Sequence, residues 1–316
     1  MTIARSICLI ISVLIPVSVS GQPFPNRPVR IVSSEPGSSN DFFARLIAQG
    51  LTASLGQQVI VDNRAIMAGD IVAKAVPDGH TLLSYGTPLW LAPLLRDNVP
   101  WDPLRDFAPI SWTTSSPNIL CVHPSVTAKS PQELIALAKA KPGALNYASS
   151  SAGSAAHLAA ELFKAMAGVN IVRVGYKGTG SALNAVIGGE VQMMFAGTSA
   201  VALHVKSGRL RALAITSAQR STLVPDLPTV AASGLPGYES SLILGMQAPA
   251  KTPVAIITRL HREIVQILNR PDVKEKLFNT GTEVVASTPA EFSAKIKSEM
   301  AIWGKVIKDA GIREEK

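Results

Sequence analysis

Strand-length apolar runs alternate with segments of helical periodicity along most of this chain, and no other feature constrains its fold as strongly. The apolar run 29–32 precedes a predicted helix over 41–55, and strand-like runs at 57–63 and 80–86 follow. Alternating strands and helices are typical of a parallel sheet whose strands are joined by crossover helices. The sequence therefore predicts an α/β fold with helices packed on the faces of a sheet.

The same alternation starts again after the apolar run 118–125. Here a strand predicted at 144–149 lies between helices predicted over 131–140 and 154–167. Each long helix has an apolar side that we expect to face a core. In the first helix it comprises Phe42, Phe43, Leu46, Ile47, Leu51 and Leu55, and in 154–167 it comprises Leu158, Leu162, Phe163 and Met166.

A loop rich in Pro, Gly and Ser closes this second unit at 223–240, and long helices follow in the tail. We therefore expect two lobes. Lobe 1 is discontinuous and comprises 22–122 and 230–316, whereas lobe 2 comprises 123–229. Each lobe is expected to contain a mostly parallel sheet flanked by helices.

Residues 1–21 are predicted to form a signal peptide, because a lone Arg5 precedes an apolar run and a small residue, Gly21. The run holds about 13 apolar residues, fewer than the ~20 needed to span a bilayer, which disfavours the alternative of a membrane anchor. Removal of this segment leaves Cys121 without a second cysteine, so no intrachain disulfide is expected. The expected location is the periplasm.

The composition is that of a globular protein, with 47% hydrophobic and 16% charged residues. The formal net charge is +8, but the basic residues are dispersed and lack interleaved aromatic residues, so no nucleic-acid partner is expected. A modest positive field suits an anionic small molecule, although the same charge also serves ordinary solubility.

Two predicted strand-to-helix junctions, 33–41 and 149–154, consist largely of small, turn-prone residues. The first turn of a helix has unpaired N–H groups and partial positive charge, so such a junction can bind an anion. The alternative is that the serines only cap helices. Two junctions at carboxyl ends of parallel strands favour a ligand site. The candidates there are Gly37, Ser38, Ser39, Ser150, Ser151, Gly153 and Ser154.

Several longer motifs carry a resemblance to a known family. In order, the chain contains PGSSND, GQQVIVDNR, VPDGHTLL, WDPLRDFAPI, NYASSSAGSAAHLAAELF, GYKGTGSALNAVIGGEVQMMFAG and WGKVIKDAGI. Their order and spacing resemble the periplasmic receptors of tripartite tricarboxylate transporters, the Bug-type solute-binding proteins. The resemblance implies a two-lobed periplasmic binding protein fold, type II-like, that closes on a small carboxylated solute. It also implies inner-membrane transporter subunits as partners.

The resemblance transfers to individual positions. Gly37 and Asp41 match the family's loop after the first strand, whereas Ser34 and Glu35 stand where the family usually has Phe and Pro. Glu35 would repel an anionic group of the ligand or pair with an amine or hydroxyl; its alternative role is a solvated loop charge. Thr87 and Thr198 end two further strands that face the cleft in the family.

Enzymatic alternatives have little support in the sequence. No G-x-S-x-G occurs, and the histidines form no spaced metal pair, so we expect no catalytic residues, metal or cofactor. His157 is expected to make a structural hydrogen bond to the loop before it. A secreted hydrolase or a ligand-sensing domain of the same fold remains the alternative to a monomeric, non-enzymatic receptor.

Overall fold

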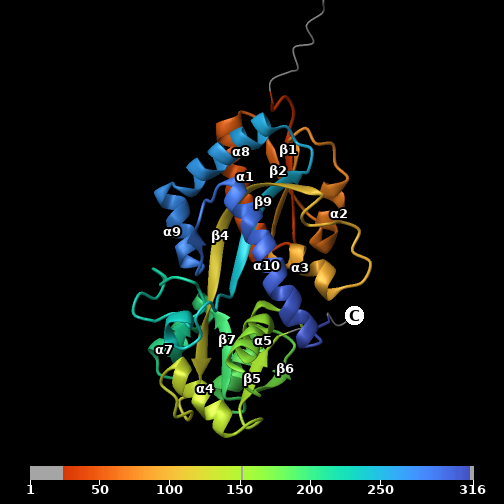
Figure 1. Cartoon of the computed structure of the whole chain (residues 1–316). Coiled ribbons are helices and arrows are strands. Elements are labelled where there is room, and N and C mark those ends of the chain that lie inside the picture. Colours follow the sequence, from red (N-terminus) through yellow and green to blue (C-terminus); the bar gives the residue numbers. More distant parts are fainter. Residues whose placement is uncertain (1–23, 151, 314–316) are drawn as a thin grey trace, which may run out of the picture.

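The computed structural model describes residues 24–150 and 152–313, so the predicted signal peptide and Ser151 lie outside the described residues. Two lobes lie one above the other in Figure 1. The first half of the chain builds most of the upper lobe with β1 (Val29–Ser33), α1 (Ser39–Leu55), β2 (Val59–Asn63), η1 (Ala65–Met67), α2 (Ala68–Ala73), β3 (Thr81–Gly86), α3 (Thr87–Leu95) and β4 (Phe107–Val122).

The lower lobe follows with a strand-helix alternation close to the predicted one. Its elements are α4 (Pro131–Ala140), β5 (Asn146–Ser149), α5 (Ala155–Ala167), β6 (Val172–Gly175), α6 (Thr179–Ile187), β7 (Met193–Gly197), α7 (Thr198–Lys206) and β8 (Arg211–Ile215). After η2 (Ala231–Ser233) the chain returns to the upper lobe through β9 (Ser241–Pro249), α8 (Val254–Leu268), α9 (Pro271–Asn279), β10 (Glu283–Val284) and α10 (Pro289–Asp309).

The strands form one curled sheet in the order β2-β1-β3-β9-β4-β7-β5-β6, with β8 and β10 also paired to β4. The outer strands are parallel: β1 pairs with β2 and β3, and β5 pairs with β6 and β7. The two strands that join the lobes add antiparallel pairs, because β9 runs antiparallel to β3 and to β4, and β4 antiparallel to β7. These antiparallel pairs were not predicted from the sequence.

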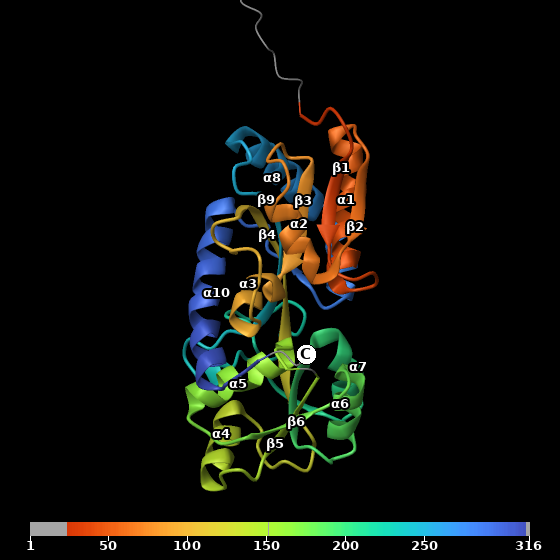
Figure 2. The same ribbon diagram turned by 90° about the vertical axis from the view of Figure 1, so that its right-hand side faces the viewer.

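The long strand β4 sets how the two lobes face each other. It pairs with β9 as far as Pro117 and with β7 from Asn118 onward, so it runs from one lobe into the other (Figures 1 and 2). Through β9, strand β3 points the same way as β4, toward the lower lobe, whereas β7 points the opposite way. The carboxyl ends of β1 and β3 therefore face the carboxyl ends of β5 and β7.

The segment before β9 is bonded to the lower lobe. Val230 donates its N–H to the carbonyl of Ile215, and Ser240 donates to that of Thr216. Tyr238 packs against Phe195 at a ring-centroid distance of 6.5 Å. The chain thus passes from one lobe to the other at 117/118, where β4 changes its pairing partner, and at 240/241, where β9 begins. The predicted lobe boundaries, after residue 122 and before residue 230, stay predictions.

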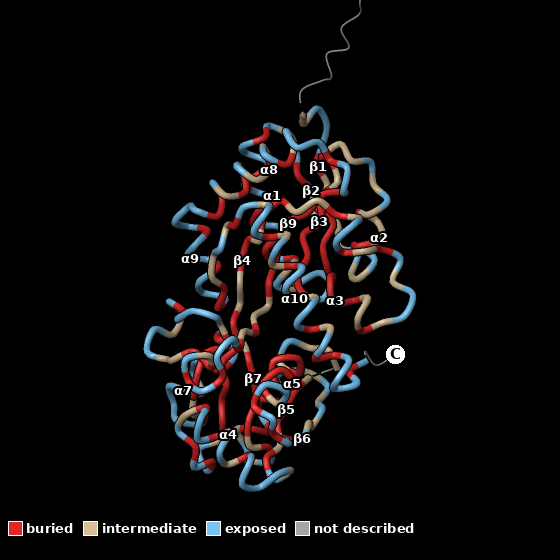
Figure 3. The backbone as a smooth tube through the Cα atoms, viewed as in Figure 1, coloured by how far each residue is buried: buried red, intermediate tan, exposed pale blue. Residues whose placement is uncertain are grey.

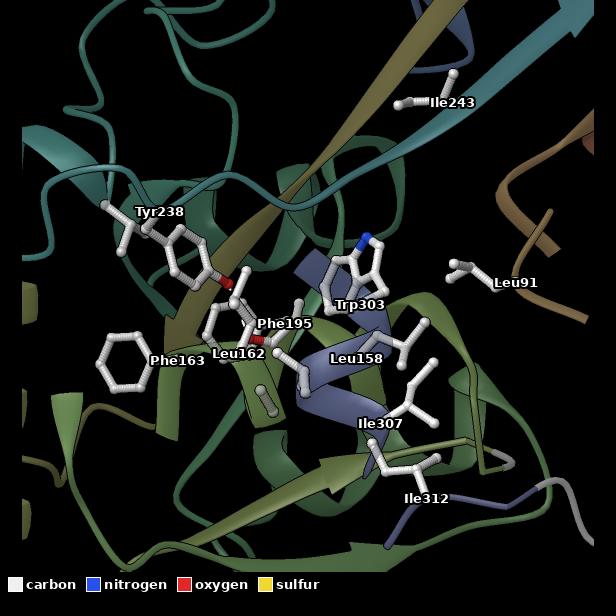
Figure 4. Packing of buried hydrophobic residues seen from close by; sticks show 14 of the residues in the cluster. Leu91, Leu158, Leu162, Phe163, Phe195, Tyr238, Ile243, Trp303, Ile307 and Ile312 are labelled. Carbon is white, nitrogen blue, oxygen red and sulfur yellow. Dashed lines mark hydrogen bonds between the residues drawn. The ribbon is translucent and has the colours of Figure 1, made fainter. Parts of the chain in front are cut away.

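Helix α10 packs against both lobes. Its Phe292 lies 5.9 Å from Trp90 of α3, between ring centroids, and its Trp303 and Ile307 are buried beside Leu158 of α5 (Figure 4). The buried backbone in Figure 3 is concentrated in the strands and in the helix faces turned toward them. One hydrophobic cluster therefore continues from the upper lobe into the lower lobe along α3, α5 and α10.

Two expected core residues are not buried. Phe42 is 41% exposed on α1 and Met166 is 39% exposed on α5, although the other apolar residues expected on those faces are buried. Both lie at the edge of the apolar stripe of their helix, where a side chain points partly to solvent. Within residues 24–150 and 152–313, no helix combines the length and apolar character that a membrane span requires.

Candidate functional site

A cavity of about 350 Å³ lies where the carboxyl ends of the two sets of parallel strands face each other. Residues from both lobes line it: the β1–α1 loop and α3 on one side, the β5–α5 loop and α5 on the other, with the start of β9 and one residue of α10. The described lining residues are Ser34, Glu35, Ser38, Asn40, Ile66, Tyr85, Thr87, Pro88, Leu91, Ala92, Leu95, Arg96, Ala152, Gly153, Ser154, Ala155, Leu158, Ser240, Ser241, Leu242 and Trp303.

The first junction is a closed network of short-range hydrogen bonds. Ser38 is the N-cap of α1, and its Oγ accepts from the N–H of Asp41 at 3.1 Å and lies 2.7 Å from Ser34 Oγ. Asp41 Oδ2 accepts from the N–H of Gly37 at 2.9 Å. The amide of Asn63 donates to Asp41 Oδ1 at 2.9 Å and to the carbonyl of Ser34 at 2.7 Å. Asp41 therefore holds the loop in place through its hydrogen bonds with the Gly37 N–H and the Asn63 amide.

Asp41 is kept ionised by these contacts. Burial by itself would raise the pKa of its carboxyl, but the hydrogen bonds from Gly37, Asn63 and Arg45 together outweigh burial and lower the pKa below its ordinary value. Arg45 Nε lies 2.9 Å from Asp41 Oδ1. The Asp41 carboxylate is thus already used in hydrogen bonds and an ion pair. Its role in the site is to position the backbone of the β1–α1 loop, including the Gly37 N–H.

The second junction is held at both ends. Ser154 is the N-cap of α5 and its Oγ accepts from the N–H of His157 at 3.3 Å. His157 Nδ1 accepts from the N–H of Gly153 at 3.0 Å, which confirms the structural hydrogen bond expected for this histidine. At the other end, Arg173 Nε donates to Ser149 Oγ at 2.9 Å and Arg173 Nη2 to the carbonyl of Ser150 at 2.8 Å.

His157 is a neutral imidazole at physiological pH. Burial, followed by the positive charge of Arg173, lowers its pKa to about 4. A neutral ring can accept at Nδ1, whereas a protonated ring can only donate. The surroundings favour the neutral form of His157, and this is the form that can accept the hydrogen bond from the Gly153 N–H.

The structure brings six of the predicted site residues to the cavity: Ser34, Glu35, Ser38, Thr87, Gly153 and Ser154. Glu35 belongs to this set although it is exposed, and Thr87 also fixes the start of β9 by accepting from the N–H of Ile243 at 3.1 Å. Gly37 and Ser39 line an adjacent hollow of about 180 Å³ that they share with Ser38.

The remaining predicted residues do not line the cavity. Asp41 accepts a hydrogen bond from the Gly37 N–H in the β1–α1 loop, and the carbonyl of Ser150 accepts one from Arg173. Thr198 begins α7 and donates its hydroxyl to the carbonyl of Pro117 at 3.4 Å, where β4 changes lobe. Ser151 lies outside the described residues.

Sequence reasoning missed the apolar wall of the cavity. One stripe of α3, at Pro88, Leu91, Ala92 and Leu95, faces it, and Leu158 and Trp303 come from α5 and α10. The positions 88, 91, 92 and 95 follow helical spacing, which was a usable signal. It was obscured because the segment TPLWLAPLL is apolar on every side and contains two prolines. Asn40, Arg96, Ser240 and Ser241 are further polar lining residues that were not predicted.

Known proteins resemble this chain over nearly its whole length. The family model of the tripartite tricarboxylate transporter family receptor, TctC, matches residues 43–312. Protein BugT of Bordetella pertussis is 37% identical over 302 residues, which cover 93% of each chain.

Two solved structures were determined with carboxylates. The R. palustris protein Rpa4515, solved with adipate, is 34% identical with a TM-score of 0.73 and covers 92% of this chain and 99% of its own. MatC of Rhodopseudomonas palustris, solved with bound malate, is 28% identical with a TM-score of 0.69 and covers 90% of this chain and 100% of its own. Both the sequence motifs and the two-lobed fold are thereby accounted for, and the chain belongs to the tripartite tricarboxylate transporter receptor family, TctC.

Proposed function

We propose that this protein is a monomeric periplasmic receptor that captures a small carboxylated solute between its lobes and delivers it, unchanged, to an inner-membrane transporter of the tripartite tricarboxylate type. The observation that carries the proposal is the cavity between the facing carboxyl edges of the two lobes. It is reached by the N-termini of α1 and α5, one from each lobe.

Each of these helix ends offers backbone N–H groups to an anion. Ser38 and Ser154 cap the third N–H of α1 and α5, which leaves the first turns partly unpaired next to the cavity. A carboxylate at such an end interacts with both the free N–H groups and the helix dipole. The malate and adipate seen in the two related structures support a carboxylate as the anionic group.

The hydrolase alternative has a weaker basis in the site. Ser154 and His157 are close in sequence, but the Ser154 hydroxyl accepts from the N–H of His157 while the ring nitrogen Nδ1 is occupied by Gly153. The pair therefore acts as a helix cap and a loop support. Within the described residues no group of His, Cys, Asp and Glu is arranged to hold a metal ion.

The test is a thermal-shift screen of the mature protein over small carboxylic acids, followed by mass spectrometry of the recovered complex. An acid present at ~100 times its dissociation constant should stabilise the folded state by roughly 2.7 kcal/mol. The recovered acid should have an unchanged mass. A screen without any stabilising acid would refute carboxylate binding, and a mass change that requires the protein would support an enzyme instead.

A further inference from the structure

The cavity has a continuous apolar wall that a purely hydrophilic acid would leave in contact with water. On α3, the side chains of Leu91, Ala92 and Leu95 reach the cavity, and each is at most 7% exposed. Leu158 of α5 faces them from the other lobe and is 5% exposed. Figure 4 shows Leu158 between Leu91 of α3 on one side and α10 on the other. The wall is thus shared by both lobes.

Trp303 completes this wall as an apolar surface. Its indole N–H donates to Glu299 Oε2 at 2.7 Å, and the residue is 3% exposed. Because that N–H is already paired, the ring has no free polar group to offer a ligand. An aromatic ring in this state contributes area for apolar contact and aromatic stacking.

The polar groups of the cavity lie in the loops and at helix ends, including Thr87 and Arg96 at the two ends of α3. Ser34, Glu35 and Ser38 belong to the β1–α1 loop, and Ser154 belongs to the start of α5. Glu35 and Arg96 are the charged residues among the described lining residues. The loop side of the cavity can therefore bind a charged group, whereas Leu91, Ala92, Leu95, Leu158 and Trp303 form an apolar face that suits an uncharged body.

We infer that the preferred ligand is an amphipathic monocarboxylate, with its carboxylate at the helix N-termini and an apolar body packed against Leu91, Leu95, Leu158 and Trp303. This inference rests on the proposed function and narrows it. A second carboxylate placed against this apolar face would lose its hydration there without compensation. An apolar body would instead remove the wall from water.

Calorimetric titration with acids of matched length tests the inference. The probes are butanoate, hexanoate and octanoate, with succinate and adipate as diacids of the same length as the first two. Each methylene that becomes buried should tighten binding about fourfold, so hexanoate should bind roughly fifteenfold tighter than butanoate. Hexanoate should also bind tighter than adipate.

The outcomes separate this inference from the proposed function. If the affinity is independent of chain length, or adipate binds tighter than hexanoate, the apolar-body inference is wrong while carboxylate binding stands. If none of the five acids binds, the apolar-body inference is wrong, and the wider thermal-shift screen alone decides whether carboxylate binding fails as well. Because this series uses the unaltered protein, no variant has to fold for the result to be decisive.

A substitution in the apolar wall tests whether contact with the wall causes the gain in affinity with chain length. Leu91→Asn keeps a similar size but puts a polar group on the α3 face, so the gain from butanoate to hexanoate should fall to less than about threefold. Leu203→Asn is the matched control, because Leu203 is 75% exposed on α7 and does not line the cavity. The control should keep the full gain, and a full gain in Leu91→Asn as well would argue against contact with α3.

Discussion

At the scale of single residues, the site combines positions that support the loops with positions that face the cavity. Asp41 and His157 each hold one loop through a backbone N–H, from Gly37 and from Gly153. Glu35 has no such duty among its described contacts: only its carbonyl takes part, by accepting from the N–H of Ser38 at 3.3 Å. Glu35 lines the cavity, so it is the residue where a single substitution should change selectivity with little effect on folding.

Glu35→Gln removes the acidic group of the cavity. For an acid that carries a hydroxyl or ammonium opposite Glu35, loss of a charge-assisted hydrogen bond should weaken binding by about ten- to hundredfold. For adipate, which has no such donor, the substitution should improve relative affinity because a repulsive charge is gone. Calorimetric titration measures both, with the exposed Glu190→Gln as a control of equal charge. Affinities that change less than about threefold for every acid would show that Glu35 has no part in selectivity.

His157 gives the protein a defined pH dependence. Its pKa falls from 6.5 to about 4 on folding, so the unfolded chain binds the proton more readily. Its contribution to stability is therefore complete above pH 6.5, declines as the pH falls toward 4, and declines no further below that. From this group alone, the free energy of unfolding should be about 2 kcal/mol lower near pH 5 than near pH 7.5. Urea unfolding of wild type and His157→Gln at both pH values isolates the effect, and equal pH dependence in the two proteins would contradict it.

At the scale of elements, the sequence was informative where a helix has one apolar and one polar side. Helices α4 and α5 were predicted within one residue of their bounds because their stripes are clear and Ser130 and Ser154 cap them. Helix α3 was missed because TPLWLAPLL is apolar on every side. For strand β4 the sequence showed only the apolar run from residue 118, because the first part of the strand is rich in Ser and Thr and is stabilised by pairing with β9. The junctions of the site were thus predictable, whereas its apolar wall depends on tertiary packing.

The β5–α5 junction can be altered while the apolar face of its helix is kept. The double substitution Ser150→Ala and Ser154→Pro removes two hydroxyls, and Pro fits residue 154 because φ there is −63°. Loss of the cap to His157 should cost about 1 kcal/mol of stability. Binding of the best carboxylic acid should fall by more than tenfold, because Ser154→Pro removes both the hydroxyl and the backbone N–H of a residue that lines the cavity. Normal binding by a strongly destabilised protein would mean that these serines are only caps.

At the scale of the whole molecule, the lobes are joined along two edges as well as through β4 and β9. On one edge Trp303 and Ile307 of α10 pack on α5, and on another Glu283 of β10 accepts hydrogen bonds from Ser221 and Thr222 of the lower lobe. Lys295 of α10 adds a partly buried ion pair of 2.8 Å with Glu239, in the segment that leads into β9. Relative motion of the lobes must therefore bend the chain at 117/118 and 240/241 while these edge contacts slide or break.

We expect such bending to close the lobes on the ligand. A hinge closure brings the two helix N-termini toward one carboxylate and shortens the molecule, so small-angle scattering should give a smaller radius of gyration at saturating ligand. Glu283→Ala removes the acceptor that Ser221 and Thr222 share and should ease the motion. If closure strains this contact, the variant should bind the same acid more tightly than wild type, because less of the binding free energy is used to break it. An unchanged radius of gyration at saturation, in both proteins, would mean that the cavity binds without closure and that Glu283 only stabilises the resting arrangement.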